Sequence, residues 1–379
     1  MECQYYRENL CHSCATIELP YEQQVAAKEN DAHTLLQAYP HVKWLPTATS
    51  AQSGFRNKAK FVVGGTADHP TLGTVDYRSG ASTDLGQCPL YIEQIEPAVP
   101  VLREFIRRAH LTPYDIPKRR GELKNILVTA SDDGQLMIRF VLRSKKLLVP
   151  IKKNMDWLCQ QLPTARVISV NLLREHVALV EGDEEIILTD HQTLPMRVND
   201  MVLHLRPQSF FQTNTSIAEA MYSQAQQWVA EVQPGSLWDL YCGVGGFALH
   251  AAEVMEPHAP VTGIEISSEA IASARWTARE SSIENLHFSA QDAPEFALSS
   301  GSVPEVLIMN PPRRGIGAKL CSWVQDSGIE RVIYSSCNAK TLAQDLERMP
   351  AYDPVQARVL DMFPNSNHYE VITLLQRRA

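Results

Sequence analysis

The sequence lacks long apolar runs, internal repeats and low-complexity segments. No stretch approaches the ~20 consecutive apolar residues that a membrane span needs. The first residues, MECQYYRENLCHSC, are polar and have no apolar core of a signal peptide. Hydrophobic residues still make up 44% of the 379 residues, which is enough for a packed interior. We therefore expect a folded, cytoplasmic protein with two or three domains and no membrane association.

Positive charge is also scarce, because 43 Asp and Glu outweigh 35 Lys and Arg and leave a net charge of −8. This balance argues weakly against a nucleic-acid partner. The stretch from Arg103 to Lys153, however, holds 13 Lys and Arg against 5 Asp and Glu. A local basic stretch can bind a polyanion, or it can simply be a solvated surface. Charge alone leaves both interpretations open.

Cysteines are few and unevenly placed. Four of the eight lie near the start, at Cys3, Cys11, Cys14 and Cys88, and one ends a predicted strand, at Cys337. In a reducing cytosol, clustered cysteines are more often metal ligands or catalysts than disulfides. The spacing of the first four fits a tetrahedral zinc site as well as an iron–sulfur cluster.

The order of predicted elements indicates an α/β protein with three parts. Residues 1–90 form a cysteine-rich segment, and residues 91–205 form a central α+β domain with strands such as NILVTA and QLMIRFVL. From residue 206 to 379, strand-like and helix-like segments alternate, which predicts a Rossmann-like parallel sheet covered by helices. Ligands bind beyond the carboxyl ends of the strands in such sheets.

A glycine-rich turn, DLYCGVGGFA at residues 239–248, closes the first of these strands. Glycine allows the tight turn and the close approach of a ligand, and Glu265 at the end of the next strand suits a ribose. Taken alone, this pattern also fits NAD. Three features favour S-adenosyl-L-methionine: Asp239 suits a cationic methionine, Asp292 suits an adenine amino group, and Asn310 opens a rigid NPPRRG loop. We also expect Gly243, the first glycine of the turn, to contact the donor.

Cys337 ends the strand RVIYSSC at the start of a helix, where we expect the helix N-terminus to lower the pKa of the thiol. Glu370 begins the otherwise apolar strand EVITLL, and His368 lies two residues before it. A thiolate and a carboxylate beside a methyl donor fit the methylation of a pyrimidine at C5. The thiolate adds to C6 and makes C5 nucleophilic, and the carboxylate then removes the C5 proton.

The chain resembles the RNA uracil-5-methyltransferases over nearly its full length, and most closely the branch that acts on 23S ribosomal RNA. The motifs SFFQTN, DLYCGVGGF, GIEI, NPPRRG, YSSCN and DMFPxxxHYE carry the resemblance. It implies that Cys337 is the nucleophile and Glu370 the base. It also implies methyl-donor contacts at Gln212, Tyr241, Glu265 and Asn310.

The resemblance extends to the four early cysteines. It implies that Cys3, Cys11, Cys14 and Cys88 hold a structural [4Fe–4S] cluster that ties the N-terminal segment to residues 55–90. We expect the RNA to be gripped by the basic stretch and by GFRNKAKF, where Arg56, Lys58 and Lys60 would contact phosphates and Phe55 would stack on a base.

Three alternatives remain at this point: the same chemistry on tRNA, an NAD-dependent oxidoreductase, and a non-catalytic RNA-binding protein. The oxidoreductase leaves Cys337, Glu370 and NPPRRG without a role. No coiled-coil pattern is visible, so we expect a monomer without an obligate protein partner.

Overall fold

The computed structural model describes residues 1–76 and 78–378, and its internal contacts form two units. Unit 1 comprises Met1–Cys14, Ser53–Met196 and Arg206–Gln208, and unit 2 comprises Ala15–Gln52, Arg197–Leu205 and Ser209–Ala379. The expected mixed α/β class is confirmed. The division into 1–90, 91–205 and 206–379 stays a prediction about domain boundaries, and the contact-based units divide the first of these segments between them.

Unit 1 is built on a seven-stranded sheet with the strand order β4-β3-β2-β5-β6-β7-β8. Its elements are α1 (Gln4–Arg7), β2 (Lys58–Gly65), β3 (Pro70–Val75), β4 (Ser82–Asp84), α3 (Ala98–Arg108), β5 (Leu123–Ala130), β6 (Leu136–Leu142), η1 (Lys145–Leu147), α4 (Leu148–Lys153), α5 (Met155–Gln161), β7 (Ala165–Leu172) and β8 (Glu184–Ile187). Only the β6–β7 pair is parallel among the described pairs of this sheet.

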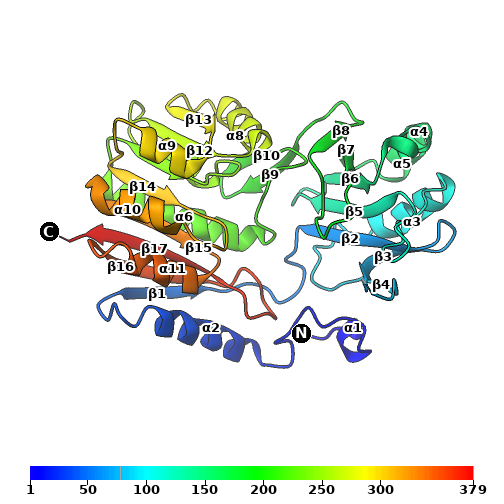
Figure 1. The fold of residues 1–379 in the computed structure, drawn as a ribbon, viewed down its shortest axis with the longest axis horizontal. Coiled ribbons are helices and arrows are strands. Elements are labelled where there is room, and N and C mark those ends of the chain that lie inside the picture. Colours follow the sequence, from blue (N-terminus) through cyan, green and yellow to red (C-terminus); the bar gives the residue numbers. More distant parts are fainter. Residues whose placement is uncertain (77, 379) are drawn as a thin grey trace. The chain divides into compact units, whose positions relative to one another are not determined.

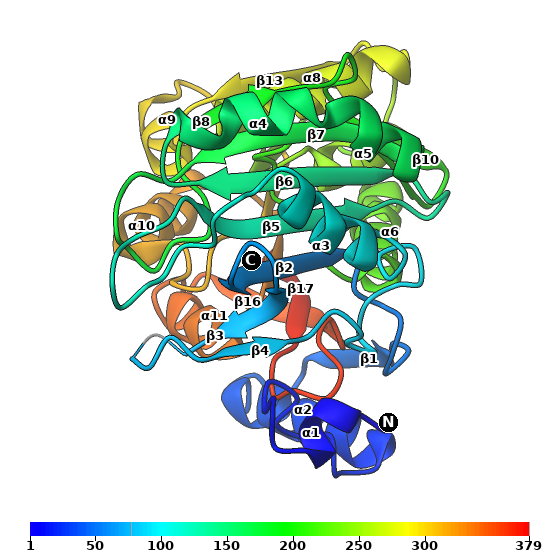
Figure 2. The same cartoon turned by 90° about the vertical axis from the view of Figure 1, so that its right-hand side faces the viewer.

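Helices α3, α4 and α5 cover one face of this sheet (Figure 2). Helix α3 buries Val99, Leu102, Phe105 and Ile106, the spacing of a single apolar helix face. These side chains pack against alternate residues of the strands, among them Phe61. The opposite face of the sheet therefore carries the remaining alternate residues of β2 and β5.

Unit 2 is built on an eight-stranded sheet with the order β1-β16-β17-β15-β14-β11-β12-β13 (Figure 1). Its elements are α2 (Tyr21–Leu35), β1 (Lys43–Ala48), β10 (Met201–Leu205), α6 (Thr215–Val232), β11 (Leu237–Leu240), α7 (Gly246–Ala252), β12 (Val261–Glu265), α8 (Ser268–Glu280), β13 (Leu286–Ala290), α9 (Ala293–Ser299), β14 (Val306–Met309), α10 (Gly317–Ser327), β15 (Arg331–Ser336), α11 (Ala339–Glu347), β16 (Tyr352–Leu360) and β17 (Glu370–Arg377). Strand β9 (Leu194–Val198) pairs with β10 in a separate two-stranded sheet.

The strands and helices predicted after residue 206 are present, and the structure adds α6 and α9; strands and helices alternate up to β16, which β17 follows without a helix between them. Neighbouring strands of the eight-stranded sheet are parallel except for β17, which runs antiparallel to both β15 and β16. Within the described residues, no helix is both long and apolar enough to cross a membrane.

Helix α2 fastens the segment between β16 and β17, which leads directly to Glu370. Lys28 and Asp361 form an ion pair with 2.6 Å between Nζ and Oδ1, and their side chains are only 4% and 0% exposed. Lys28 Nζ also donates to the carbonyl of Phe363 at 3.0 Å, and Tyr21 Oη donates to Asp361 Oδ2 at 2.7 Å. This buried network fixes the path of the chain into β17.

We predict that Lys28→Met lowers the free energy of unfolding by about 3–5 kcal/mol, because it leaves the Asp361 carboxylate buried without its cation. Urea denaturation followed by circular dichroism measures the change. Lys319→Met, at an exposed position on α10, is the control and should stay within about 0.5 kcal/mol of the parent chain. Equal stability of the two variants would contradict the structural role of Lys28.

Candidate active site

The unusual residues of unit 2 gather where its strands end. Parallel strands β11, β12, β14 and β15 lie side by side, so their carboxyl ends meet at one edge of the sheet. The backbone N–H of Asn310, just after β14, donates to the carbonyl of Leu240 at 3.3 Å. This bond joins the NPPRRG loop to the start of the glycine-rich turn.

The glycine-rich turn has the backbone that its sequence predicts. Tyr241, Gly243 and Gly245 all have left-handed φ angles, of 65°, 54° and 85°. Tyr241 is the unusual member, since a bulky residue rarely adopts this conformation, and such strain is concentrated at functional sites. Open space surrounds the position that a Cβ on Gly243 would take. The Gly243 N–H donates to Glu265 Oε2 at 3.3 Å, which ties the turn to the end of β12.

Asp239 is fully buried at this turn. Its Oδ2 accepts a hydrogen bond from the Ala248 N–H at 3.0 Å, whereas its Oδ1 is buried without a partner. Burial raises the pKa of this carboxyl to about 8, and the nearby Glu265 adds to the shift. A buried carboxyl oxygen without a partner lowers the stability of the fold unless a ligand supplies a hydrogen bond or an opposite charge.

Cys337 and Glu370 are brought together by the direction of β17. Because β17 is antiparallel to β15, its first residues lie beside the last residues of β15, and Ser336 is paired with Val371. Cys337 directly follows β15, and Glu370 begins β17. His368, two residues before Glu370, is exposed, whereas Glu370 is buried.

The ionisation of both groups is perturbed. Burial raises the pKa of the Glu370 carboxyl to about 8, against a smaller opposing effect of Arg313. Glu370 Oε2 is buried without a partner. Burial also raises the pKa of the Cys337 thiol, followed by the charge of Glu370, while Arg313 acts in the opposite direction. The predicted lowering of the thiol pKa by the helix N-terminus is therefore wrong.

Arg313 in the NPPRRG loop faces this pair and is clamped from α11. Its carbonyl accepts hydrogen bonds from Asn338 Nδ2 at 3.1 Å and from Thr341 Oγ1 at 3.2 Å. Asp345 accepts from the Ile316 N–H at 2.9 Å. A Cβ on Gly315 would lie 2.3 Å from Asp345 Oδ2, so only glycine fits this position.

Sequence reasoning missed two residues of the site. Arg313 was not assigned a role from the sequence, and the signal that could have found it is its positive charge directly after the two prolines of the NPPRRG loop. Tyr222 on α6 is buried at helical spacing, as a core residue would be. Burial raises the pKa of Tyr222, with further contributions from Asp239 and Glu370, so its hydroxyl lies near both carboxyls.

The remaining residues predicted to contact the methyl donor are Asp292, Tyr241 and Gln212. Asp292 caps α9 and accepts from the Glu295 N–H at 3.0 Å. Burial raises the pKa of Tyr241 to about 12, and Asp292 contributes, so these two groups are neighbours. Gln212 is buried before α6 and makes polar contacts.

The four early cysteines line one pocket of unit 1, with a volume of about 170 Å³. Burial raises the pKa of Cys14 to about 11, and the charges of Cys88, Cys11 and Cys3 add to it, in that order. All four are free thiols. Within residues 1–76 and 78–378, no group of three or more Cys, His, Asp or Glu has the geometry to hold a metal ion.

The residues of GFRNKAKF that were predicted to bind RNA are either buried or line the cysteine pocket. Phe55 is only 8% exposed, so its ring cannot stack on an incoming base without rearrangement. Arg56, Lys58 and Lys60 line the same pocket as the cysteines. Burial lowers the pKa of Lys58 to about 8, and the nearby charge of Arg139 adds to the shift.

Two comparisons of the sequence with known proteins identify the same family. The sequence model of the family described as tRNA (Uracil-5-)-methyltransferase matches residues 21–378. The chain is 46% identical over 379 residues to the 23S rRNA (uracil(747)-C(5))-methyltransferase RlmC of Yersinia pseudotuberculosis, covering 100% of both chains. The protein of the same name from Yersinia pestis is also 46% identical, with the same coverage.

Among solved structures, the tRNA (uracil-54, C5)-methyltransferase of Pyrococcus abyssi, in complex with S-adenosyl-L-homocysteine, has a similar fold. The TM-score is 0.79 at 24% sequence identity, over 96% of this chain and 85% of that chain. This likeness concerns the fold alone.

We predict that Glu370→Gln stabilises the protein at high pH and changes little at low pH. The native carboxyl has a pKa of about 8 and keeps its proton up to that pH, whereas a glutamate in the unfolded chain has an ordinary pKa of 4.5. The stability that this group contributes is therefore fully present below about pH 4.5 and is lost as the pH rises through 8. A neutral glutamine avoids this loss, so the gain above pH 8 should be on the order of a few kcal/mol.

Urea denaturation at pH 5 and pH 8.5 measures this effect. Glu280→Gln, at the exposed end of α8, serves as the control and should show no such difference. The same shift for Glu370→Gln at both pH values would argue against a buried, protonated carboxyl.

Proposed function

The chain belongs to the tRNA (uracil-5-)-methyltransferase family, and on that premise we propose that it methylates C5 of a uracil in 23S rRNA with S-adenosyl-L-methionine as donor. The identity of 46% over the whole chain to two rRNA enzymes favours rRNA over tRNA, since the similar tRNA enzyme is 24% identical. The target would be the uridine equivalent to 747. The oxidoreductase and the non-catalytic alternatives do not fit this family.

The observation that carries the proposal is the pairing of Cys337 with Glu370 at the carboxyl edge of the sheet. The Cys337 thiolate adds to C6 of the uracil and makes C5 nucleophilic. Once C5 carries the methyl group, Glu370 takes the C5 proton, and the C6–S bond breaks to release the thiolate. A pKa of about 8 makes the Glu370 carboxylate a stronger base, and its ionised fraction accepts this proton near neutral pH.

Arg313 supports both groups from the NPPRRG loop. Its guanidinium opposes the upward pKa shifts of Cys337 and Glu370. It therefore favours the thiolate before addition and the carboxylate before proton removal. The clamp by Asn338 and Thr341 on its carbonyl keeps it in this position.

The donor supplies an electrophilic methyl group when bound. The buried Asp239 Oδ1 without a partner and the open space at Gly243 fit such a ligand. We assign the cationic methionine part to Asp239, the ribose to Glu265 and the adenine amino group to Asp292. Gln212, Tyr241 and Asn310 complete the proposed donor site.

We further propose that Cys3, Cys11, Cys14 and Cys88 hold a structural [4Fe–4S] cluster. The four thiols share one pocket, and the pKa of Cys14 responds to the other three. Arg56 lines this pocket, and its Nε is buried without a partner, as a donor to an anionic group would be. The proposed enzyme is a cytoplasmic monomer, since one unit of one chain supplies both Cys337 and Glu370.

The first prediction of this proposal concerns methyl transfer. Labelled S-adenosylmethionine should yield a single 5-methyluridine in unmodified 23S rRNA and none in unmodified tRNA, with the product mapped by mass spectrometry. Cys337→Ala should lower the rate on the order of 10⁴-fold or more, because addition to C6 is lost. Glu370→Gln should accumulate a methylated covalent complex, because release needs a base. Label in tRNA alone would overturn the assigned substrate.

The nucleophile has a separate control. RNA with 5-fluorouridine at the target should trap a covalent adduct with the parent enzyme, because no C5 proton can leave. Cys159→Ser, at a half-buried thiol of unit 1, should still form the adduct. An adduct with Cys337→Ala would show that another residue is the nucleophile.

The second prediction concerns the cluster. Protein purified without oxygen should be brown and contain about four irons per chain. Cys14→Ser should lose most of this iron, because one of the four thiolates is removed, whereas Cys159→Ser should keep it. Elemental analysis and the visible absorbance measure both. Stoichiometric zinc without iron would replace the cluster by a zinc site.

A further inference from the structure

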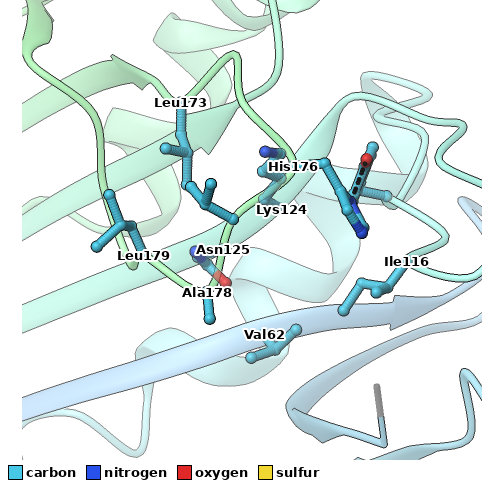
Figure 3. A pocket seen from close by; sticks show the side chains of 10 residues that line it. Val62, Ile116, Lys124, Asn125, Leu173, His176, Ala178 and Leu179 are labelled. Carbon is cyan, nitrogen blue, oxygen red and sulfur yellow. Dashed lines mark hydrogen bonds between the residues drawn. The ribbon is translucent and has the colours of Figure 1, made fainter. Parts of the chain in front are cut away.

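Unit 1 contains a second pocket, of about 240 Å³, on the sheet face opposite the helices (Figure 3). It is lined by Val62, Tyr114, Ile116, Lys124, Asn125, Leu173, His176, Val177, Ala178 and Leu179. Neither Cys337 nor Glu370 nor any proposed donor contact lies in this unit. The proposed reaction therefore leaves this pocket without a role.

A bulge in β5 shapes the inner end of the pocket. The register between β5 and β6 shifts between Leu123 and Asn125, so Lys124 is an extra residue without a paired partner on β6. Bulges of this kind redirect side chains. Here, Lys124 and Asn125, which are neighbours in the sequence, both line the cavity (Figure 3).

Lys124 is buried and forms no ion pair within the described residues; burial lowers its pKa, and the charge of Glu175 opposes this shift. It is only 7% exposed. Its Nζ donates to the carbonyl of Glu175 at 2.6 Å and lies 4.9 Å from the centre of the Tyr114 ring. An ammonium has three donors, so Lys124 can still donate to a ligand in the cavity.

The other walls combine fixed polar groups with exposed apolar ones. The Tyr114 hydroxyl and His176 Nδ1 are 3.0 Å apart, and this bond is drawn in Figure 3. Val177 and Leu179 are 48% and 63% exposed. Exposed apolar side chains beside a cavity with a buried donor suit a flat apolar ring with hydrogen-bond acceptors on its edge, as a nucleobase has.

The charge near the pocket also suits RNA. Ile116 lines the cavity, and the exposed sequence Lys118-Arg119-Arg120 follows two residues later. Lys118 is paired with Asp115. Arg119 and Arg120 form no ion pair within the described residues, so both can meet phosphates. A purely apolar protein partner would need neither these cations nor the buried Lys124.

We propose that this pocket receives one unpaired base of the RNA substrate, other than the target uracil. Lys124 donates to an acceptor on the edge of the base, Val177 and Leu179 pack against its ring, and Arg119 and Arg120 contact the adjoining phosphates. The proposal rests on the RNA methylation proposed above and adds a second point at which the enzyme reads its substrate.

The test uses Leu179→Glu in the full chain, with fluorescence anisotropy on a synthetic RNA hairpin that spans nucleotide 747 of 23S rRNA. Leu179 is exposed, so the variant should fold. We expect the RNA affinity to fall about tenfold or more, because one base loses its site. Val303→Glu is the matched control: it is an exposed apolar residue outside unit 1 and outside the basic stretch, and it changes the charge equally. An equal loss in both variants, or no loss in Leu179→Glu, would overturn the proposal.

An abasic scan of the same hairpin identifies the base. In the parent enzyme, one abasic position outside the target should weaken binding about as much as Leu179→Glu does. In Leu179→Glu, an abasic site at that position should cause no further loss of RNA affinity. If every abasic site lowers the affinity of the variant as much as it lowers that of the parent enzyme, the proposal is overturned. RNA binding is measured here without methyl transfer, so this result is independent of the methylation assay. If the parent enzyme methylates the RNA but Leu179→Glu binds it normally, the proposed base-binding pocket is refuted and the proposed function stands.

Discussion

The antiparallel insertion of β17 between β15 and β16 is the constraint on which the site depends. In an all-parallel sheet, the first residue of a strand lies at the edge opposite the catalytic loops. Reversing one strand brings Glu370 to the edge where Cys337 follows the last residue of β15. The chain can make this reversal because α2 fastens the segment before it, through the buried pair of Lys28 and Asp361. The N-terminal part of unit 2 thereby helps to position a residue more than 300 positions away.

The site keeps two carboxyl groups under conditions that disfavour their charge. Asp239 and Glu370 are both buried, both have a pKa of about 8 and both have an oxygen without a partner. Such groups cost stability, and proteins retain them mainly where function needs them. A cationic donor would give Asp239 a partner of opposite charge, and Glu370, once ionised, would accept the C5 proton. The same burial that destabilises these groups prepares them for the proposed reaction.

The two units carry different parts of the proposed function. Unit 2 supplies the reacting groups, and unit 1 supplies the cysteine pocket, the whole basic stretch and the pocket around Lys124. The bulge in β5 is a local departure from a regular sheet, and it directs the Lys124 side chain toward the pocket. Recognition of one more base outside the reaction centre would let the enzyme distinguish one RNA loop from others with the same target base.

The sequence by itself determined the order of strands and helices, the glycine-rich turn and the roles proposed for Cys337 and Glu370, because these depend on local spacing and on the chemistry of single residues. Only the tertiary structure decided what surrounds them. It buried Phe55, raised the pKa of Cys337, turned Arg313 toward the reacting pair and gathered the four cysteines in one pocket. Burial and charge around a side chain come from segments far apart in the chain, so local patterns do not contain them.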